Sequence, residues 1–333
     1  MNVFLTGITG LLGSEVARQL LERGYKIRAL VRTPENVKLH HPDIEYVQGD
    51  ILDVTVLEEQ MQGMDYVIHA AAIVSFAPKD RNRMYKTNVE GTANVVNACL
   101  SAGIKKLGYV SSIAAFGRPP LSEMKKADRV EIDEEQKWIA SETNSHYAIT
   151  KYLGECEVWR GAAEGLKMVI VNPSIILGES DWEMSSTRLF KYVYDEKPFY
   201  PEGFLNFTDV RDVASALIRL LESDTQEERF CISAGMVSYK EFFDRIADRF
   251  GKKKPWFRVS AGMMGAIWRL EALKSFLTGA APLITKETAK TAQLKILQKN
   301  GKIRETLGFE FRTLDETLDR VCTFLESKEL KKA

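Results

Sequence analysis

Three glycines near the amino terminus constrain this chain more than any other feature. They stand in the segment Thr6-Gly7-Ile8-Thr9-Gly10-Leu11-Leu12-Gly13, which follows the short apolar run 2–5 and opens an apolar helical pattern over 11–21. This order predicts a strand, a tight turn and a helix, and free amides at such a helix start can bind a pyrophosphate. Gly7 can take backbone angles closed to other residues, Gly10 lets a diphosphate approach the main chain, and Gly13 lets the helix pack closely on the sheet. A tight turn in any α/β protein could also use one or two of these glycines.

A tyrosine and a lysine form the second motif, Tyr147-Ala148-Ile149-Thr150-Lys151. Residues four apart share one face of a helix, so we expect the Lys151 ammonium near the phenol of Tyr147. A neighbouring cation favours the phenolate and lowers the pKa of a tyrosine from about 10, which brings it nearer to acid/base strength at neutral pH. An amphipathic surface helix offers the same spacing, but it does not explain the glycine turn.

Two serines follow the apolar run 107–110, which predicts a buried strand that ends at Ser111 and Ser112. In a parallel sheet the carboxyl ends of the strands face the ligand crevice, so we expect Ser112 to donate a hydrogen bond to a substrate oxygen. The alternative is that one of the serines only caps a turn.

Strand and helix patterns alternate along the chain, which predicts an α/β fold with a doubly wound parallel sheet of the Rossmann type. The interpretation assigns residues 1–178 to a dinucleotide-binding domain and 179–333 mainly to a smaller substrate-binding lobe, with about 206–233 returning to the core. We expect strands at 26–31, 44–48, 66–69 and 167–172, and helices at 54–61, about 84–101 and from 147 onward. The polar stretch 116–144 is interpreted as a surface excursion at the rim of the site, and the lysine-rich tail 328–332 as a frayed end.

These motifs together resemble the extended short-chain dehydrogenase/reductase family, and within it most closely the dihydroflavonol reductase branch. Further matches are Gly49-Asp50-Ile51-Leu52-Asp53, His69-Ala70-Ala71-Ala72, Asn88-Val89-Glu90-Gly91-Thr92, Asn172-Pro173-Ser174 and Phe207-Thr208-Asp209-Val210-Arg211-Asp212. The resemblance spans roughly residues 1–325. It implies that Ser112, Tyr147 and Lys151 are catalytic. It also implies a cofactor site made of Thr6, Gly7, Thr9, Gly10, Leu11, Leu12, Gly13, Asp50, Ile51, Ala70, Ala71, Ala72, Asn88, Ser111, Tyr147, Lys151, Pro173 and Ser174. A homodimer through the helices near 84–101 and 147–164 is a further implication.

The residue at the end of the second strand bears on the choice of nicotinamide cofactor. An enzyme for NAD usually places Asp or Glu there, about 20 residues beyond the glycines, to accept from the ribose hydroxyl. This chain has Arg32 instead, a forked cation suited to a 2′-phosphate, with Lys38 as a second candidate. We therefore expect NADP rather than NAD.

Composition excludes several classes of function. The chain carries 46 Lys and Arg against 46 Asp and Glu, so no basic balance favours nucleic acid. The four cysteines lack metal-ligand spacing, which predicts no metal site and reduced thiols of a cytoplasmic protein. The first strand begins at residue 2, so we expect no leader sequence, and no apolar stretch reaches membrane-spanning length. The best candidate begins at Val259, and we interpret 259–284 as an amphipathic lid, with a peripheral membrane contact as the alternative.

The sequence thus predicts an NADP-dependent oxidoreductase that reduces a carbonyl of a small or medium, largely apolar substrate, with Tyr147 as proton donor. Mostly apolar residues are expected around the point of hydride transfer: Val74, Phe76, Phe116, Ile175 and Phe207. Two alternatives stay open. One is a nucleotide-sugar epimerase or dehydratase with retained NAD, and the other is a dinucleotide-binding scaffold without turnover.

Overall fold

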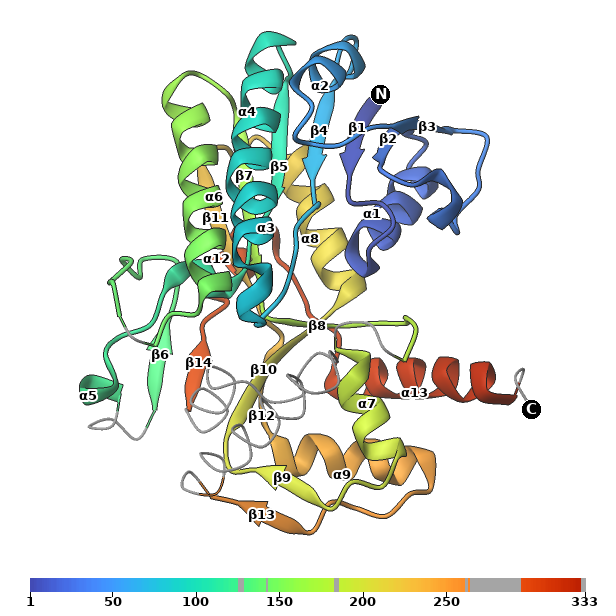
Figure 1. The fold of residues 1–333 in the computed structure, drawn as a ribbon, viewed down its shortest axis with the longest axis vertical. Helices are drawn as coiled ribbons and strands as arrows, with labels where there is room; N and C mark the ends of the chain where they lie inside the picture. The colour runs from blue at the N-terminus through green and yellow to red at the C-terminus, as the bar shows by residue number, and fades with distance from the viewer. Residues whose placement is uncertain (125–128, 142, 183–185, 261–262, 264–294, 331–333) are drawn as a thin grey trace.

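A seven-stranded parallel sheet forms the centre of the computed structural model, which describes residues 1–124, 129–141, 143–182, 186–260, 263 and 295–330 (Figure 1). The strand order is β11-β7-β5-β4-β1-β2-β3, and every neighbouring pair is parallel. The strands are β1 (Asn2–Thr6), β2 (Lys26–Val31), β3 (Ile44–Gln48), β4 (Tyr66–His69), β5 (Lys106–Val110), β7 (Met168–Pro173) and β11 (Glu228–Ile232). The doubly wound fold predicted from the alternating pattern is confirmed.

Helices cover both faces of this sheet because successive strand residues point to opposite sides. Val3 and Leu5 enter one core, and Phe4 between them enters the other. The first core lies under α1 (Leu11–Glu22), α8 (Val210–Glu222) and α12 (Gly301–Leu307). The second lies under α2 (Val54–Gln60), α4 (Gly91–Ser101) and α6 (His146–Ala163). A short helix α3 (Arg81–Tyr85) and a π-helical turn (Lys86–Glu90) lead into α4, and 3-10 turns lie at Pro34–Asn36, Pro78–Asp80 and Ile113–Phe116.

A smaller lobe with its own core lies beyond the carboxyl ends of the strands (Figure 1). Its sheet has the order β12-β10-β8. The elements of the lobe are β8 (Ile175–Leu177), α7 (Thr187–Tyr194), β9 (Phe199–Pro201), β10 (Phe204–Asp209), β12 (Gly235–Ser238), α9 (Tyr239–Phe250), β13 (Phe257–Val259) and α13 (Leu314–Leu330). The segment 206–233 contributes to both units. Strand β10 lies in the lobe sheet, whereas β11 is a strand of the large sheet and α8 packs against that sheet.

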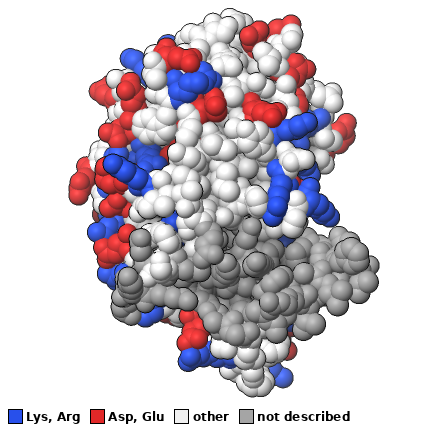
Figure 2. All heavy atoms as spheres, turned by 60° about the vertical axis from the view of Figure 1, so that its left-hand side comes forward, with Lys and Arg blue, Asp and Glu red and all other residues white. Residues whose placement is uncertain are grey.

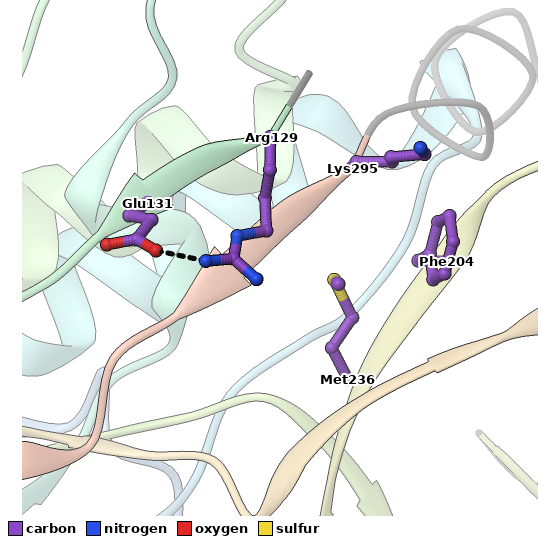
Figure 3. A pocket seen from close by; sticks show the side chains of 5 residues that line it. All are labelled: Arg129, Glu131, Phe204, Met236 and Lys295. Atoms are coloured by element: carbon purple, nitrogen blue, oxygen red, sulfur yellow. Dashed lines mark hydrogen bonds and ion pairs between the residues drawn. The ribbon is translucent and has the colours of Figure 1, made fainter. Parts of the chain in front are cut away.

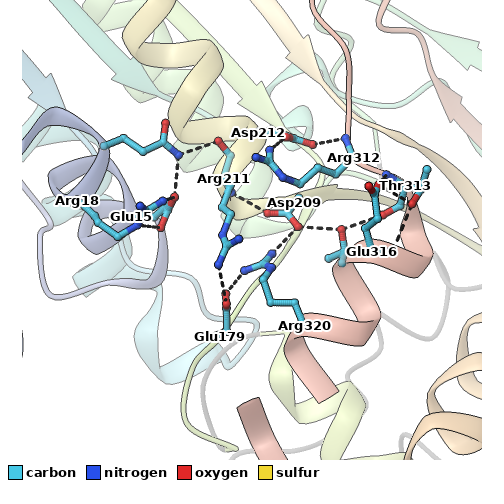
Figure 4. Close-up of polar contacts among 12 residues, drawn as sticks. Glu15, Arg18, Glu179, Asp209, Arg211, Asp212, Arg312, Thr313, Glu316 and Arg320 are labelled. Carbon is cyan, nitrogen blue, oxygen red and sulfur yellow. Dashed lines mark hydrogen bonds and ion pairs between the residues drawn. The ribbon is translucent and has the colours of Figure 1, made fainter. Parts of the chain in front are cut away.

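Buried ion pairs join the lobe to the large sheet around β10 and α8 (Figure 4). The Asp209 carboxylate accepts a hydrogen bond from Thr317 Oγ1 at 2.8 Å and pairs with Arg320 of α13. Asp212 accepts from the backbone N–H of Arg312 at 2.8 Å. Helix α13 is therefore fixed to the start of α8 by charge as well as by apolar packing.

Two segments contain more regular structure than their sequences indicate: the rim excursion 116–144 and the start of the tail at 328–330. The stretch 116–144 contains α5 (Leu121–Met124) and β6 (Val130–Ile132), and β6 pairs in parallel with the distant strand β14 (Ile296–Gln298). The tail is not frayed at Lys328, because α13 continues to Leu330 and Lys328 pairs with Asp181. The heptad-like spacing of Leu314, Leu318, Val321 and Leu325 explains why the helix persists. The proposed lid over 259–284 lies almost wholly outside the described residues.

Within the part of the chain that the structure describes, no helix is long and apolar enough to cross a membrane. The same residues contain no group of three or more His, Cys, Asp and Glu side chains that could hold a metal ion. The four cysteines are free thiols, three of them buried.

Candidate active site

The glycine turn forms a cradle that only glycine can occupy. Gly7 has φ +82°, and a Cβ there would lie 2.6 Å from Ala71 N; a Cβ on Gly13 would lie 2.0 Å from Gly7 O. Gly10 caps α1 without any side-chain hydrogen bond, and the first backbone bond of the helix runs from Ser14 N to Gly10 O at 3.0 Å. The amides of Leu11, Leu12 and Gly13 consequently have no partner in the helix and are available to an anion. This geometry fits the diphosphate of a dinucleotide, with Thr9 exposed beside it.

Buried polar side chains hold the neighbouring strand ends beside this cradle. Thr6 Oγ1 accepts from Ala71 N at 3.2 Å and bonds His69 Nδ1 at 2.7 Å. Burial and the charge of Lys151 lower the pKa of His69 to about 3, so the imidazole is neutral. Asn88 uses both ends of its amide on residue 73 and also donates to Thr150 Oγ1 at 3.1 Å. Asn88 therefore braces the segment after β4 against α6.

The remaining residues expected at the cofactor lie at the same edge of the sheet. Asp50 and Ile51 follow β3, where Asp50 Oδ1 accepts from Leu52 N at 3.0 Å and Ile51 is buried against Gly91. Ala70 and Ala72 follow β4 on either side of Ala71. Pro173 ends β7, and the buried hydroxyl of Ser174 beyond it has no hydrogen-bond partner among the described residues. An unpaired buried hydroxyl at this edge suits the polar end of a bound cofactor.

Tyr147 lies in the first turn of α6, whose start is fixed by Ser145 accepting from Ala148 N at 3.0 Å. Burial raises the pKa of Tyr147, and a hydrogen bond with Ser112 opposes that rise. The phenol is therefore protonated at neutral pH. Ser112 follows β5, and its hydroxyl also accepts from Ala114 N at 3.2 Å.

Lys151 shares the face of Tyr147, as the spacing predicted, but its ammonium points elsewhere. Nζ donates to Val110 O at 2.9 Å and to the hydroxyl of Tyr109 at 3.2 Å, and it lies 4.7 Å from the centre of the Tyr109 ring. Burial lowers the pKa of Lys151 to about 8. The expectation that Lys151 lowers the pKa of Tyr147 is wrong for this structure: Ser112 does so. The spacing of Tyr147 and Lys151 places them on one face of α6, but the carbonyl oxygen of Val110 at the end of β5 determines where the Lys151 ammonium lies.

The two cations expected at the 2′-phosphate differ in their surroundings. Arg32 follows β2, is exposed, and its guanidinium makes no hydrogen bond or ion pair with the described residues. Lys38 instead pairs with Asp181 at 2.8 Å, and Asp181 also binds Lys328. The structure therefore leaves Arg32 free for a ligand and holds Lys38 in an ion-pair network.

The expected substrate residues divide into two groups. Phe76 and Val74 are exposed, and the ring of Phe76 lies edge-on to Tyr147 with centres 6.0 Å apart. Phe116 and Phe207 are buried in apolar clusters, and Ile175 pairs in register with Phe207. Val74 and Phe76, which follow β4, are therefore the two members of this set with exposed side chains. Trp138 of the rim stacks on Tyr152 with centres 4.3 Å apart.

A hollow of about 590 Å³ lies in the lobe, lined by Arg129, Glu131, Phe204, Met236 and Lys295 (Figure 3). Its walls come from β6, β10, β12 and the residue before β14. None of the residues expected to be catalytic lines it, so it is a feature of the lobe and not of the reaction centre.

Comparison with known proteins agrees with this geometry. Residues 3–233 match the model of the family described as "NAD dependent epimerase/dehydratase family". The chain belongs to this family. It is 38% identical over 325 residues, 95% of this chain and 92% of the relative, to a Synechocystis protein whose name likens it to dihydroflavonol 4-reductase. It is 28% identical to the anthocyanidin reductase of Arabidopsis thaliana over 98% of this chain and 95% of that protein. The crystal structure of a UDP-glucose 4-epimerase from Thermotoga maritima shares the fold, with a TM-score of 0.79 at 20% identity over 99% and 100% of the two chains.

Membership in this epimerase/dehydratase family confirms the resemblance to extended short-chain dehydrogenases/reductases and to their dihydroflavonol reductase branch. The protein is an NAD(P)-dependent oxidoreductase of that class. Three residues of the site escaped the sequence analysis: Tyr109, Glu155 and Arg229. The signal for Glu155 was present, since it stands one turn beyond Lys151 on the face of Tyr147.

Proposed function

We propose that this protein is an NADP-dependent reductase of a small or medium, largely apolar carbonyl compound, with Tyr147 as the proton donor. The observation that carries the proposal is the place of the Tyr147 phenol in the first turn of α6, with the exposed ring of Phe76 beside it and Ser112 at the end of β5 as its hydrogen-bond partner. Reduction of a carbonyl by hydride transfer needs a proton donor at the oxygen, which Tyr147 supplies, and the ring of Phe76 offers an apolar surface beside it.

The nicotinamide of the bound cofactor would supply the hydride, and the chain does the rest. Tyr147 gives its hydroxyl proton to the carbonyl oxygen while Ser112 donates a hydrogen bond to the same oxygen. The Lys151 ammonium would hold the nicotinamide ribose. Positioning and proton supply are thus the protein's contribution.

The preference for NADP rests on Arg32. Its guanidinium is exposed and uncommitted among the described residues, and the chain has no acidic residue at the end of β2 to accept from an unphosphorylated ribose. A forked cation can bind a phosphate with two parallel hydrogen bonds.

One of the two cations expected to serve a nucleotide sugar is already paired within the protein, which favours a simple carbonyl. A sugar diphosphate needs cations, and the two candidates from the sequence were Arg188 and Arg211. Arg211 is paired with Glu179 at 3.1 Å, in the network that holds α13 (Figure 4). Phosphates left without partners in an apolar site lower affinity steeply.

The proposal is tested by NADPH oxidation against a matched panel of aromatic ketones, aliphatic aldehydes, UDP-glucose and UDP-galactose, with NADH in parallel. We expect the highest kcat/KM for a simple carbonyl with NADPH. A higher value for a UDP-sugar than for every simple carbonyl would establish the epimerase or dehydratase alternative. Cofactor binding without any turnover would establish a scaffold.

We further propose that two copies associate through the side of the molecule formed by α4 and α6. Figure 2 turns this side forward: the middle of the face carries few charged side chains, and charges gather along its margins. Exposed apolar residues there are Tyr85, Ile149 and Trp159. Light scattering during gel filtration should show a dimer for the wild type and for Trp256→Glu, and a monomer for Trp159→Glu; a monomeric wild type overturns the proposal.

The four unpaired cysteines support the cytoplasm as the working compartment, since thiols stay reduced there.

A further inference from the structure

Glu155 lies where three segments beside the reaction centre meet, those that carry Ser111, Asn172 and Arg229. It lies on α6, one turn beyond Lys151, and its side chain is 2% exposed. Oε2 accepts from Ser111 Oγ at 2.6 Å and from Asn172 Nδ2 at 2.8 Å, while Oε1 accepts from Arg229 at 3.0 Å. One carboxylate therefore binds side chains from the ends of β5, β7 and β11.

These bonds fix the backbone at Ser112 through two contacts. Ser111, the residue before it, is tied by its hydroxyl, and Asn172 Nδ2 also donates to the carbonyl oxygen of Ser112 at 3.0 Å. Ser112 in turn makes the hydrogen bond with Tyr147. Displacement of Glu155 would consequently move the group that orients the phenol.

Arg229 extends the same network to the rim of the site. Its guanidinium donates to the carbonyl oxygens of Glu134 and Gln136, at 2.9 Å each, and lies 4.7 Å from the centre of the Phe116 ring. The rim segment that carries Trp138 is thereby tied to the charge of Glu155.

We propose that Glu155 is the positioning residue of this active site: its carboxylate sets the place of Ser112 against Tyr147 through Ser111 and Asn172, and its charge lies one helical turn from the buried ammonium of Lys151. The ion pair with Arg229 would not by itself account for the arrangement, because a buried pair adds little net stability over apolar packing. The second oxygen, shared by Ser111 and Asn172, acts on Ser112 through these two side chains. The kinetic part of this inference rests on the proposed function, in which Tyr147 is the acid.

The groups packed around Lys151 leave its charge largely uncompensated. Tyr109 of β5 and neutral His69 of β4 face it, and Tyr147 precedes it on α6. Burial depresses the pKa of Lys151 to about 8, and the charge of Glu155 opposes that depression. Without this carboxylate, Lys151 would lose its proton at a lower pH.

Glu155→Gln removes the charge and keeps the length of the side chain. We expect kcat for an accepted carbonyl to fall about tenfold to hundredfold, with the KM for that carbonyl little changed, because misplacement of a reacting group acts on the chemical step. The basic limb of the pH profile should move down by about 1 unit, the lower end of the effect of a nearby opposite charge. Glu157→Gln is the matched control on the same helix, since Glu157 pairs with Arg160 at the surface, and we expect it to behave as wild type.

Glu155→Asp separates charge from geometry and serves if the Gln variant does not fold. It keeps the carboxylate, so the basic limb should stay in place while kcat falls, because the shorter side chain cannot reach Ser111 and Asn172 together. An Asp variant with full kcat, or a Gln variant with an unmoved limb, overturns the proposal.

A readout without substrate distinguishes this inference from the proposed function. NMR of protein with nitrogen-15-labelled lysine follows the titration of Lys151 Nζ, assigned by its loss in Lys151→Met. A lower pKa of Lys151 in Glu155→Gln supports the inference even if no carbonyl is reduced, which would refute only the proposed function. An unchanged titration in a protein that does reduce carbonyls refutes the inference alone.

Discussion

Buried charges serve different purposes in the two halves of this molecule. At the edge of the large sheet, Lys151 and Glu155 are both 2% exposed; Lys151 binds neutral groups, and Glu155 pairs with Arg229 but also accepts from the neutral side chains of Ser111 and Asn172. Where the lobe joins the large sheet, Asp209 of β10 and Asp212 of α8 are as deeply buried, but each pairs with an arginine from the carboxyl-terminal region of the chain, Arg320 and Arg312 (Figure 4). The comparison teaches that burial of a charge does not by itself identify a functional residue. What identifies one is whether its hydrogen-bond partners contact the groups that react.

The largest effect expected at the sheet edge is on the rate. Tyr147→Phe removes the proton donor and keeps the ring, so turnover of an accepted carbonyl should fall about 10²-fold or more. Steady-state kinetics with NADPH measures this loss. Tyr152→Phe on the same helix is the control and should keep its activity, and a fully active Tyr147→Phe protein would show that Tyr147 is not the acid.

The largest effect expected in the lobe is on stability. Arg320→Met leaves Asp209 buried without its cation, which costs about 3–5 kcal/mol. Urea unfolding measures this change. The control is Arg249→Met, which contacts the same helix α13 through the exposed partners Asp315 and Asp319, and its loss should stay within about 1 kcal/mol. If Arg320→Met and Arg249→Met lower the free energy of unfolding equally, the predicted difference between the buried and the surface ion pairs is wrong.

A smaller effect concerns Arg32. Arg32→Ala should weaken NADPH binding by about 1.5–3 kcal/mol, the worth of hydrogen bonds to a charged group, and leave NADH binding unchanged. Titration by nicotinamide fluorescence compares the two cofactors. Arg28→Ala provides the control, because Arg28 is paired with Glu45. Equal wild-type affinity for NADPH and NADH would sink the proposed preference.

The smallest effect is the response of His69 to acid. Its pKa is about 3 in the folded protein and about 6.5 in an unfolded chain, so the unfolded state binds the extra proton as the pH falls. Stability is complete above pH 6.5 and declines toward pH 3, by about 2 kcal/mol at pH 5. Unfolding at pH 7 and pH 5 should show this loss in the wild type and a smaller loss in His69→Gln. The same loss in both proteins would assign the acid sensitivity to other groups.

The sequence predicted the sheet edge far better than the lobe, for physical reasons. The glycine cradle and the helix of Tyr147 are local motifs, and the alternation of strand and helix patterns predicts parallel units. The pairing of β6 with β14 joins residues far apart in the chain, and no pattern in either three-residue segment predicts its partner. Likewise, the spacing of Lys151 gave its face on α6, but its contact with Val110 O depends on where β5 ends.

A double-mutant cycle of Tyr147→Phe and Arg320→Met tests most directly whether the edge groups act in the chemistry while the lobe charges join the two units. Single-turnover reduction by NADPH and urea unfolding are measured for the wild type, both single variants and the double variant. We predict that the rate loss belongs to Tyr147 and the stability loss to Arg320, and that both add in the double variant within about 0.5 kcal/mol. A folded Arg320→Met protein that loses the chemical step as severely as Tyr147→Phe would contradict this division of roles.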